Sequence, residues 1–222
     1  MNAIKKIASL ALAAMLGISS LPALAESAPV QPELVARVKD IIEADGYQFK
    51  DLNDNGELDP YEDWRLPAEE RAENLLSMMD ASQKATQMVH LTLVTKKDSW
   101  FSKDNVGFAL VYEYIFDMEE ADEEDDEEEG ENAVQVTGSA MNAAVKTNEI
   151  QELSESSELG IPVIFSMDTE AGAAFVKDAT FLPDEINLGA ANHEELTAKY
   201  YQVLKEELEA IGVRMALSPD AD

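Results

Sequence analysis

Gly160-Ile-Pro-Val-Ile-Phe-Ser-Met-Asp168 is the stretch of sequence from which the expected fold follows. Residues 161–165 are five consecutive apolar residues with no polar face, which predicts a strand covered on both sides, as in a parallel sheet. The run closes on Asp168. Because ligands of parallel α/β folds lie at the carboxyl ends of strands, Asp168 is the first candidate for a functional residue.

A second run of this kind, Ile211-Gly-Val-Arg-Met-Ala-Leu-Ser-Pro219, follows about fifty residues later. An amphipathic helix is expected between the two runs, over residues 193–210. Asn192 is predicted to cap this helix, and Glu194 and Glu195 suit its first turn because of the helix dipole. The three segments predict one βαβ unit, and so an α/β fold class.

Charge and composition exclude several classes of partner. The chain has 222 residues, no cysteine, 46 acidic against 16 basic residues and a formal net charge of −30. Nucleic acid is not expected as a partner because a polyphosphate requires a basic surface. An anionic membrane surface is disfavoured for the same reason, and no disulfide is possible.

The first 25 residues are predicted to be a signal peptide, outside the fold. Lys5 and Lys6 form a positive start, residues 7–18 are uncharged and Ala23-Leu24-Ala25 is a small-x-small cleavage pattern. The apolar run is shorter than the roughly 20 residues that span a membrane. A secreted or periplasmic protein is therefore expected, with no membrane attachment after cleavage.

Residues 26–80 are expected to contain helices and one metal-type loop. Apolar residues at helical spacing predict a helix over residues 31–45, which Gly46 ends. Pro67 suits the start of a second helix over residues 68–79. Asp80 and Gln83 form a capping-box pattern that predicts a third helix, to about residue 88.

The loop at residues 51–62 has the pattern of a twelve-residue calcium loop. Gly56 occupies the sharp turn at position 6. The predicted metal ligands are Asp51, Asn53, Asn55, Glu57 through its backbone carbonyl, Asp59 directly or through water, and Glu62 with both oxygens. A structural calcium ion is therefore one expectation. A connector rich in Asx turns that needs no metal is the alternative, and Pro60 argues against a paired EF-hand domain.

Residues 81–222 are expected to hold the strands. A first strand is predicted over residues 89–95, and His90 beside it is interpreted as a hydrogen-bonded structural residue. Residues 117–132 form an acidic segment in which twelve of the first fifteen residues are Asp or Glu. Like charges repel and bury nothing, so a disordered insertion is predicted, with a weak calcium-binding segment as the alternative. A helix is expected over residues 140–159.

These pieces, in this order, resemble the N-terminal region of family 3 glycoside hydrolases of the exported bacterial β-glucosidase type. Three stretches carry the resemblance: Phe49-Lys-Asp-Leu-Asn-Asp-Asn-Gly-Glu-Leu-Asp-Pro-Tyr-Glu-Asp-Trp64, residues 71–88 and residues 160–168. Phe181-Leu-Pro183 and the final helix, strand and Ser-Pro-Asp-Ala-Asp222 complete it. The acidic segment is not matched.

The resemblance implies the first part of a (β/α)₈ barrel and a retaining exo-hydrolase that acts on terminal β-linked glucosyl residues. It implies that Asp168 binds hydroxyls of the terminal sugar and that catalysis needs no cofactor. A retaining mechanism uses two carboxyl groups about 5 Å apart. The resemblance places both carboxyl groups beyond Asp222. No catalytic residue is therefore expected among residues 1–222, and these residues alone are not expected to be active.

Two departures from the family pattern leave alternatives open. The family commonly has Asp-x-x-His-Gly where this chain has Asp168-Thr-Glu-Ala171-Gly172, so a histidine that shapes the subsite is missing. Three barrel strands are expected here, over residues 89–95, 161–167 and 213–217, whereas a barrel has eight. The missing remainder of the barrel is therefore one expected partner. A non-catalytic, exported, acidic calcium-binding module and a β-N-acetylhexosaminidase type of the same family are the alternative functions.

Overall fold

The computed structural model describes residues 28–120, 134–136 and 138–219. The helices and strands discussed below belong to one compact unit, Leu34–Asp222, and residues 28–33 before it contain no regular secondary structure. The predicted signal peptide lies outside the described residues. Among the described helices, none combines the length and the apolar character needed to cross a membrane.

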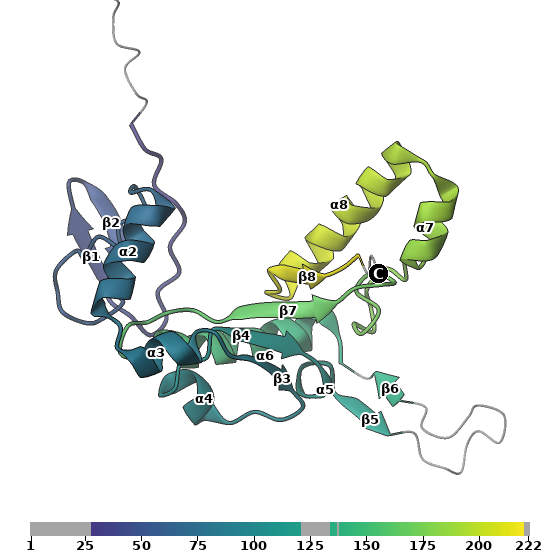
Figure 1. The fold of residues 1–222 in the computed structure, drawn as a ribbon, viewed down its shortest axis with the longest axis horizontal. Coiled ribbons are helices and arrows are strands. Elements are labelled where there is room, and N and C mark those ends of the chain that lie inside the picture. Colours follow the sequence, from purple (N-terminus) through teal and green to yellow (C-terminus); the bar gives the residue numbers. More distant parts are fainter. Residues whose placement is uncertain (1–27, 121–133, 137, 220–222) are drawn as a thin grey trace, which may run out of the picture. The chain divides into compact units, whose positions relative to one another are not determined.

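A parallel sheet forms the centre of the fold. Its strands are β3 (His90–Leu93), β4 (Phe108–Val111), β7 (Ile164–Asp168) and β8 (Met215–Leu217), in the order β3-β4-β7-β8 (Figure 1). All three strand pairs are parallel. The predicted βαβ unit is thus confirmed, and the sheet is compatible with part of a (β/α)₈ barrel.

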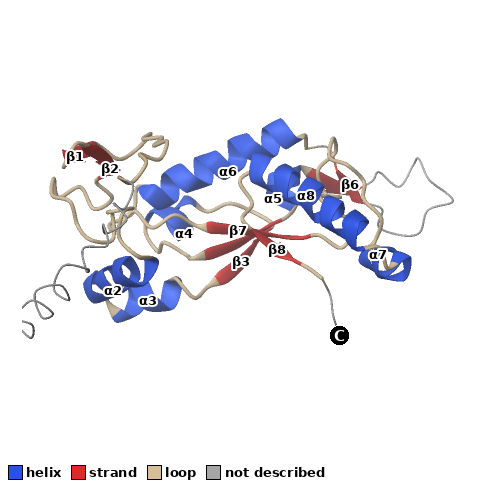
Figure 2. Ribbon diagram, turned by 90° about the horizontal axis from the view of Figure 1, so that it is seen from above, coloured by secondary structure: helices blue, strands red, loops and turns tan. Residues whose placement is uncertain are grey.

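Helices cover one face of this sheet. They include α4 (Asp98–Ser102), α5 (Glu113–Phe116), α6 (Ala140–Glu155) and α8 (Glu194–Ala210), which lie on the same side of the strands (Figure 2). The core between these layers contains Phe165 and Met167 from β7, Ile150 from α6 and Leu204 from α8. Alternate residues of each strand point into this core, as the pleat requires.

The count of three barrel strands was wrong, because β4 is a fourth. Its four residues are apolar and lie within an aromatic-rich segment, so a short strand could not be distinguished from other packing. Ala109 and Val111 are buried against the helices. The first predicted strand, residues 89–95, is present as β3, and its residues His90 and Thr92 are exposed because they point to the face of the sheet that these helices do not cover (Figure 2).

The helix expected over residues 31–45 is absent, and a β-hairpin occupies its second half. Strand β1 (Ile41–Ala44) pairs antiparallel with β2 (Tyr47–Lys50). Asp45 and Gly46 connect them with positive φ angles of 55° and 82°. An Asp-Gly pair favours this two-residue turn, because its twist matches that of the strands, so Gly46 makes a hairpin turn and does not end a helix.

The other predicted helices before the barrel strands are present. α2 spans Ala68–Met78 after Pro67, and α3 spans Ala81–Thr86. The capping box of α3 is formed: Gln83 N donates to Asp80 Oδ1 at 2.7 Å, and Asp80 N donates to Gln83 Oε1 at 2.9 Å.

Two details of the later segments differ from expectation. Asn192 does not cap α8: it ends α7 (Glu185–Ala191) with a left-handed backbone, and His193 caps α8 through Nδ1. The predicted disordered insertion, residues 117–132, begins in ordered structure, because β5 (Met118–Glu120) pairs with β6 (Val134–Val136). Backbone pairing keeps both ends of the segment together. Residues 121–133 lie outside the described part of the chain.

Candidate functional site

Asp168 ends β7 on the side of the sheet that faces away from the core. Phe165 and Met167 are buried, so the alternating residues Ile164, Ser166 and Asp168 point to the opposite face. Ile164 is 41% exposed, and Asp168 is partly exposed. The carboxylate therefore lies at the carboxyl end of a strand and remains accessible to a ligand.

The strand register extends this surface across the sheet. Residues in register in a parallel sheet point to the same face. The open face, as we name it, consists of His90, Thr92, Phe108, Leu110, Ile164, Ser166, Asp168, Met215 and Leu217. The helices named above lie on the other side of the strands (Figure 2). This face combines a few polar groups with apolar side chains, as ligand sites do.

A histidine-serine contact lies on the open face. His90 Nε2 and Ser166 Oγ are 2.6 Å apart, and the His90 ring lies 5.8 Å from that of Phe108. Ser166 is fully buried, and the contact joins β3 to β7 across β4. This contact agrees with the interpretation of His90 as a hydrogen-bonded structural residue.

A second polar contact joins the segments that follow β7 and β8. Ser218 Oγ donates to Glu185 Oε1 at 2.5 Å, and Glu185 N donates to Glu170 O at 3.2 Å. Burial, and next the charge of Glu185, raise the pKa of Tyr201. Because Leu217 is in register with Asp168, this contact holds the chain beside the candidate carboxylate. The sequence did not predict the contact between Ser218 and Glu185, because Glu185 looks like an ordinary acidic residue in the first turn of a helix.

The calcium-type loop is ordered by its own hydrogen bonds. The Asp51 carboxylate accepts from Asn55 N at 3.0 Å and from Gly56 N at 2.8 Å. The Glu62 carboxylate accepts from Leu52 N at 2.7 Å and Asp59 N at 3.0 Å. These bonds place the first and the last predicted ligand side by side along the loop.

The middle of the loop is held by side-chain amides. Asn53 Nδ2 and Asn55 Nδ2 both donate to Asp59 Oδ2 at 2.7 Å. Glu57 is exposed, and its backbone N–H donates to Asn55 Oδ1 at 2.7 Å. The side chains of five of the six predicted ligands therefore form hydrogen bonds within the loop: Asp51, Asn53, Asn55, Asp59 and Glu62. Among the described residues, however, no three carboxylate or imidazole groups converge closely enough to form a metal cage.

Two carboxylates of the loop are buried, and its one described ion pair joins buried Lys39 to Asp54 at 2.6 Å. Asp51 and Glu62 are 5% and 4% exposed, and no ion pair to Asp51, Asp59 or Glu62 occurs in the described ranges. Burial raises the pKa of Glu62 despite its backbone hydrogen bonds, and burial together with Glu62 raises the pKa of Tyr61. Hard oxygen donors of this kind fit a calcium ion, which would compensate for the lost solvation.

The loop packs near the amino end of β7, whereas Asp168 lies at the carboxyl end. Tyr61 Oη donates to Leu159 O at 3.3 Å. Gly160 has a φ of +59°, and a Cβ atom there would lie 2.5 Å from Leu52 O. Residues at the amino end of barrel strands serve stability and those at the carboxyl end serve function. The two candidate sites therefore have different expected roles.

Comparison with known proteins places these features in a family. The glycosyl hydrolase family 3 N terminal domain matches residues 128–222. The periplasmic beta-glucosidase/beta-xylosidase of Dickeya chrysanthemi is 32% identical over 212 residues, which cover 88% of this chain and 30% of the relative. Probable beta-glucosidase C of Aspergillus oryzae is 30% identical over 184 residues, which cover 80% of this chain and 27% of the relative.

The fold agrees with this assignment. The exo-1,3/1,4-beta-glucanase of a Pseudoalteromonas species has a TM-score of 0.55 at 22% identity, covering 69% of this chain and 18% of that chain. At that identity the likeness concerns the fold alone. The chain spans about 30% of the length of the Dickeya relative. From the sequence match, the parallel sheet and the strand-ending Asp168, we conclude that the chain belongs to glycosyl hydrolase family 3 and corresponds to an N-terminal portion of its members.

Proposed function

We propose that these residues form the first part of the sugar-binding site of an exported, retaining, exo-acting β-glucosidase-type hydrolase. The Asp168 carboxylate accepts hydrogen bonds from hydroxyls of the terminal sugar. The observation that carries the proposal is the position of Asp168, at the carboxyl end of β7 on the open face. The names of the relatives, beta-glucosidase and beta-xylosidase, support the substrate class.

These 222 residues alone are proposed to bind sugar without cleaving it. A retaining mechanism needs two carboxyl groups about 5 Å apart. Among the residues that end the four strands of the parallel sheet or directly follow them, Asp168 alone carries a carboxyl group; the others are Leu93, Val94, Val111, Tyr112, Thr169, Leu217 and Ser218. The nucleophile and the acid/base are proposed to come from the remainder of the barrel.

The test uses the 222-residue chain with 4-nitrophenyl β-D-glucoside and with glucose. No release of nitrophenol is expected, and saturation-transfer NMR is expected to detect glucose binding that Asp168→Ala removes. Asp104→Ala, at an exposed aspartate in another part of the chain, is the matched control and should bind like the wild type. Turnover lost in Asp168→Ala would contradict the proposed inactivity, and equal glucose binding by both chains would exclude the role of Asp168.

N-acetylglucosamine distinguishes the alternative substrate type. The β-glucosidase type should bind glucose more tightly, because a site shaped for a hydroxyl leaves little room for an acetamido group. Tighter binding of N-acetylglucosamine by the same chain would instead assign the β-N-acetylhexosaminidase type.

We further propose that loop 51–62 binds a structural calcium ion. The side chains of Asp51, Asn53, Asn55, Asp59 and Glu62 would hold it, together with the backbone carbonyl of Glu57. The buried carboxylates without a described ion pair support this proposal. Because the loop lies at the amino end of β7, the ion stabilises the fold and takes no part in catalysis. A calcium-binding module without catalysis is the second candidate function.

Thermal unfolding tests the calcium proposal. A ligand at 100 times its Kd stabilises the folded state by about 2.7 kcal/mol, so excess calcium should raise the Tm by several degrees over EDTA. Glu62→Gln should remove this difference. Glu57→Gln is the control, because its side chain is exposed and only its carbonyl is expected to bind. Equal Tm values in calcium and EDTA would exclude the site.

Export to the periplasm is proposed through cleavage after residue 25. The periplasmic beta-glucosidase/beta-xylosidase relative supports this localisation. Mass spectrometry of the chain from a periplasmic extract should give a mature protein that begins at Glu26. A chain that keeps residues 1–25 in the cytoplasm would contradict the proposal.

A further inference from the structure

Loop 51–62 contains a pair of residues that can react with each other. Asn55 is followed directly by Gly56, and both residues are exposed. Asparagine is a thermolabile residue, because its side-chain carbonyl group lies within reach of the next backbone nitrogen. Glycine has no Cβ atom to shield that nitrogen. A Cβ atom built at Gly56 would meet no atom within 4 Å beyond its chain neighbours, so packing does not block the nitrogen either.

The reaction that this pair allows is deamidation through a cyclic imide. The Gly56 nitrogen attacks Cγ of Asn55, and the new N–C bond closes the imide ring. The bond from Cγ to Nδ2 breaks, and ammonia leaves with the proton of the Gly56 nitrogen. Water then opens the imide at one of its two carbonyl groups, which gives aspartate or isoaspartate at position 55. Water is the co-reactant, and nothing is oxidised or reduced.

In the folded loop, both reacting groups are engaged in hydrogen bonds. Gly56 N donates to Asp51 Oδ2 at 2.8 Å, so its proton points to a carboxylate. Asn55 Oδ1 accepts from Glu57 N at 2.7 Å, and Asn55 Nδ2 donates to Asp59 Oδ2 at 2.7 Å. Before the attack, the nitrogen must give up its proton beside the negative charge of Asp51, and the amide must leave two partners.

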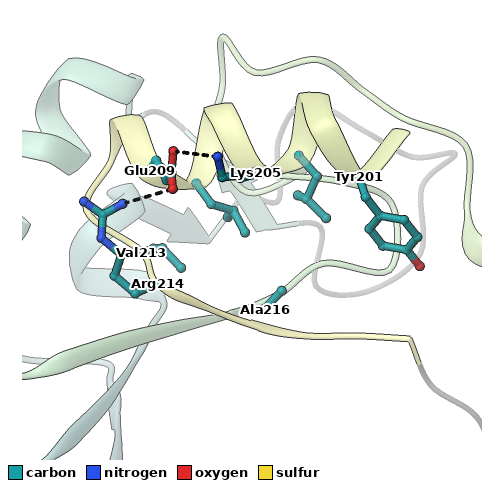
Figure 3. Close-up of a pocket in the computed structure, with 8 residues that line it drawn as sticks. Tyr201, Lys205, Glu209, Val213, Arg214 and Ala216 are labelled. Atoms are coloured by element: carbon teal, nitrogen blue, oxygen red, sulfur yellow. Dashed lines mark ion pairs between the residues drawn. The ribbon is translucent and has the colours of Figure 1, made fainter. Parts of the chain in front are cut away.

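These hydrogen bonds are shorter than the ion pairs on the surface of α8. Beside the groove between α8 and β8, Lys205 Nζ lies 3.7 Å from Glu209 Oε2, and Arg214 Nη1 lies 3.9 Å from Glu209 Oε1 (Figure 3). Short hydrogen bonds to a carboxylate are strong, whereas long, exposed ion pairs are weak. Asp51 is also buried, so water competes little for its oxygens. The loop must therefore open locally before Asn55 reacts.

We propose that Asn55 is a site of spontaneous deamidation, and that local opening of loop 51–62 sets its rate. The Asp51 carboxylate keeps the Gly56 nitrogen unreactive while the loop is closed. The aspartate product replaces the amide that donates to Asp59 with a second carboxylate, and like charges repel. The isoaspartate product adds an atom to the backbone and displaces the residues that follow, so either product weakens the loop. The proposal depends neither on calcium nor on sugar binding.

Peptide mapping of the 222-residue chain, kept at neutral pH with EDTA, tests the proposal. Cleavage after Lys50 and Arg65 gives one peptide that contains Asn53 and Asn55, and tandem mass spectrometry assigns the modified residue. In denaturant, Asn55 should deamidate faster than Asn53, which no glycine follows, and Gly56→Ala should remove this difference. In the folded chain, Asn55 should react at least about tenfold more slowly than in denaturant.

Variants identify the protecting hydrogen bond. Asp51→Ala removes the acceptor of the Gly56 N–H group and should bring the rate close to that of the unfolded chain. Asp59→Ala frees the Asn55 amide and should raise the rate less. Asp104→Ala, at an exposed aspartate outside the loop, is the control and should keep the wild-type rate. Circular dichroism shows which variants are folded.

A denaturant series on the wild-type chain needs no variant. The deamidation rate of Asn55 should already rise at concentrations below the global unfolding transition, as expected when a local segment opens first. The transition itself is followed by circular dichroism on the same samples.

Three results would overturn the proposal. The first is an equal rate at Asn55 in the folded and the unfolded chain, or no reaction in the unfolded chain. The second is a slower reaction in folded Asp51→Ala than in the wild type, which would make Asp51 a base that assists the attack. The third is a rate that rises only with global unfolding, which would assign the protection to the whole fold. None of these results changes glucose binding or the calcium-dependent Tm, which test the proposed function separately.

Discussion

Single side chains connect segments that are distant in the sequence. Thr147 Oγ1, on α6, donates to Ile211 O at 2.8 Å. A Cβ atom at Gly212, whose φ is +83°, would lie 3.0 Å from Thr147 Oγ1. The threonine thus fixes the turn between α8 and β8, and only glycine suits position 212. At the other end of β8, Tyr201 and Ser218 meet Glu185.

The raised pKa of Tyr201 predicts a loss of stability at high pH. The folded state favours the protonated phenol, so this stabilisation is complete below the unfolded pKa and disappears as the pH rises through the folded pKa. The free energy of unfolding, from urea titrations between pH 8 and 11, should fall less steeply in Tyr201→Phe. Tyr61 and Tyr200 also have raised pKa values, so the free energy of unfolding of Tyr201→Phe should still decrease with pH, with a smaller slope than in the wild type.

Tyr114→Phe is the control for this experiment, since it removes the hydroxyl of another partly buried tyrosine. It should keep the wild-type slope. An unchanged slope in Tyr201→Phe would show that burial and Glu185 do not disfavour ionisation of its hydroxyl.

At the scale of elements, short segments are stabilised by contacts at their ends. α3 has six residues and no buried side chain, so its capping box and its neighbours must hold it. Gln87 follows α3 and donates through Nε2 to Asn105 O at 2.6 Å, which links this helix to the turn before β4. Asn105 in turn donates to Ile161 O at 2.8 Å.

Loss of the capping box should destabilise the protein measurably. Asp80→Ala removes an acceptor for the first helical N–H groups, and cap removal costs about 1 kcal/mol. Urea unfolding should show this decrease with an unchanged m value. Asp98→Ala, at the start of α4, is the matched control because α4 has no side-chain cap bond. A decrease of equal size in both variants would argue against a specific capping effect.

At the scale of the whole molecule, the net charge opposes compactness. Forty-six acidic residues face sixteen basic ones, and like charges in a compact state repel one another. Most of the ion pairs described include at least one exposed partner, so they offset little of this repulsion.

Screening by salt is therefore expected to stabilise the fold. The Debye length shortens from about 30 Å at 0.01 M to about 10 Å at 0.1 M salt. The Tm should rise by a few degrees between 10 and 200 mM sodium chloride, measured with EDTA present to exclude calcium binding. Sucrose at the same osmolality is the control for effects unrelated to charge. A constant or falling Tm would show that repulsion is not a major term.

The sequence by itself determined the features that depend on neighbouring residues. These features arise between residues that are close in the sequence. They are the capping box of Asp80 and Gln83, the helices α6 and α8, and the hydrogen bonds of loop 51–62. The parallel sheet was also predicted, from the apolar run at residues 161–165. That run predicted two covered faces, but in the described residues the helices cover one face, and Ile164 on the other face is 41% exposed (Figure 2). The Asp45-Gly46 turn was equally local, and a helical spacing that happened to match obscured it.

Only the tertiary structure decided which distant residues meet. β4 becomes a strand because β3 and β7 supply backbone partners on both sides. His90 meets Ser166 and Glu185 meets Ser218 because the sheet brings together residues that are 76 and 33 positions apart in the sequence. Local preferences act through adjacent dihedral angles, whereas these contacts depend on strand order and register.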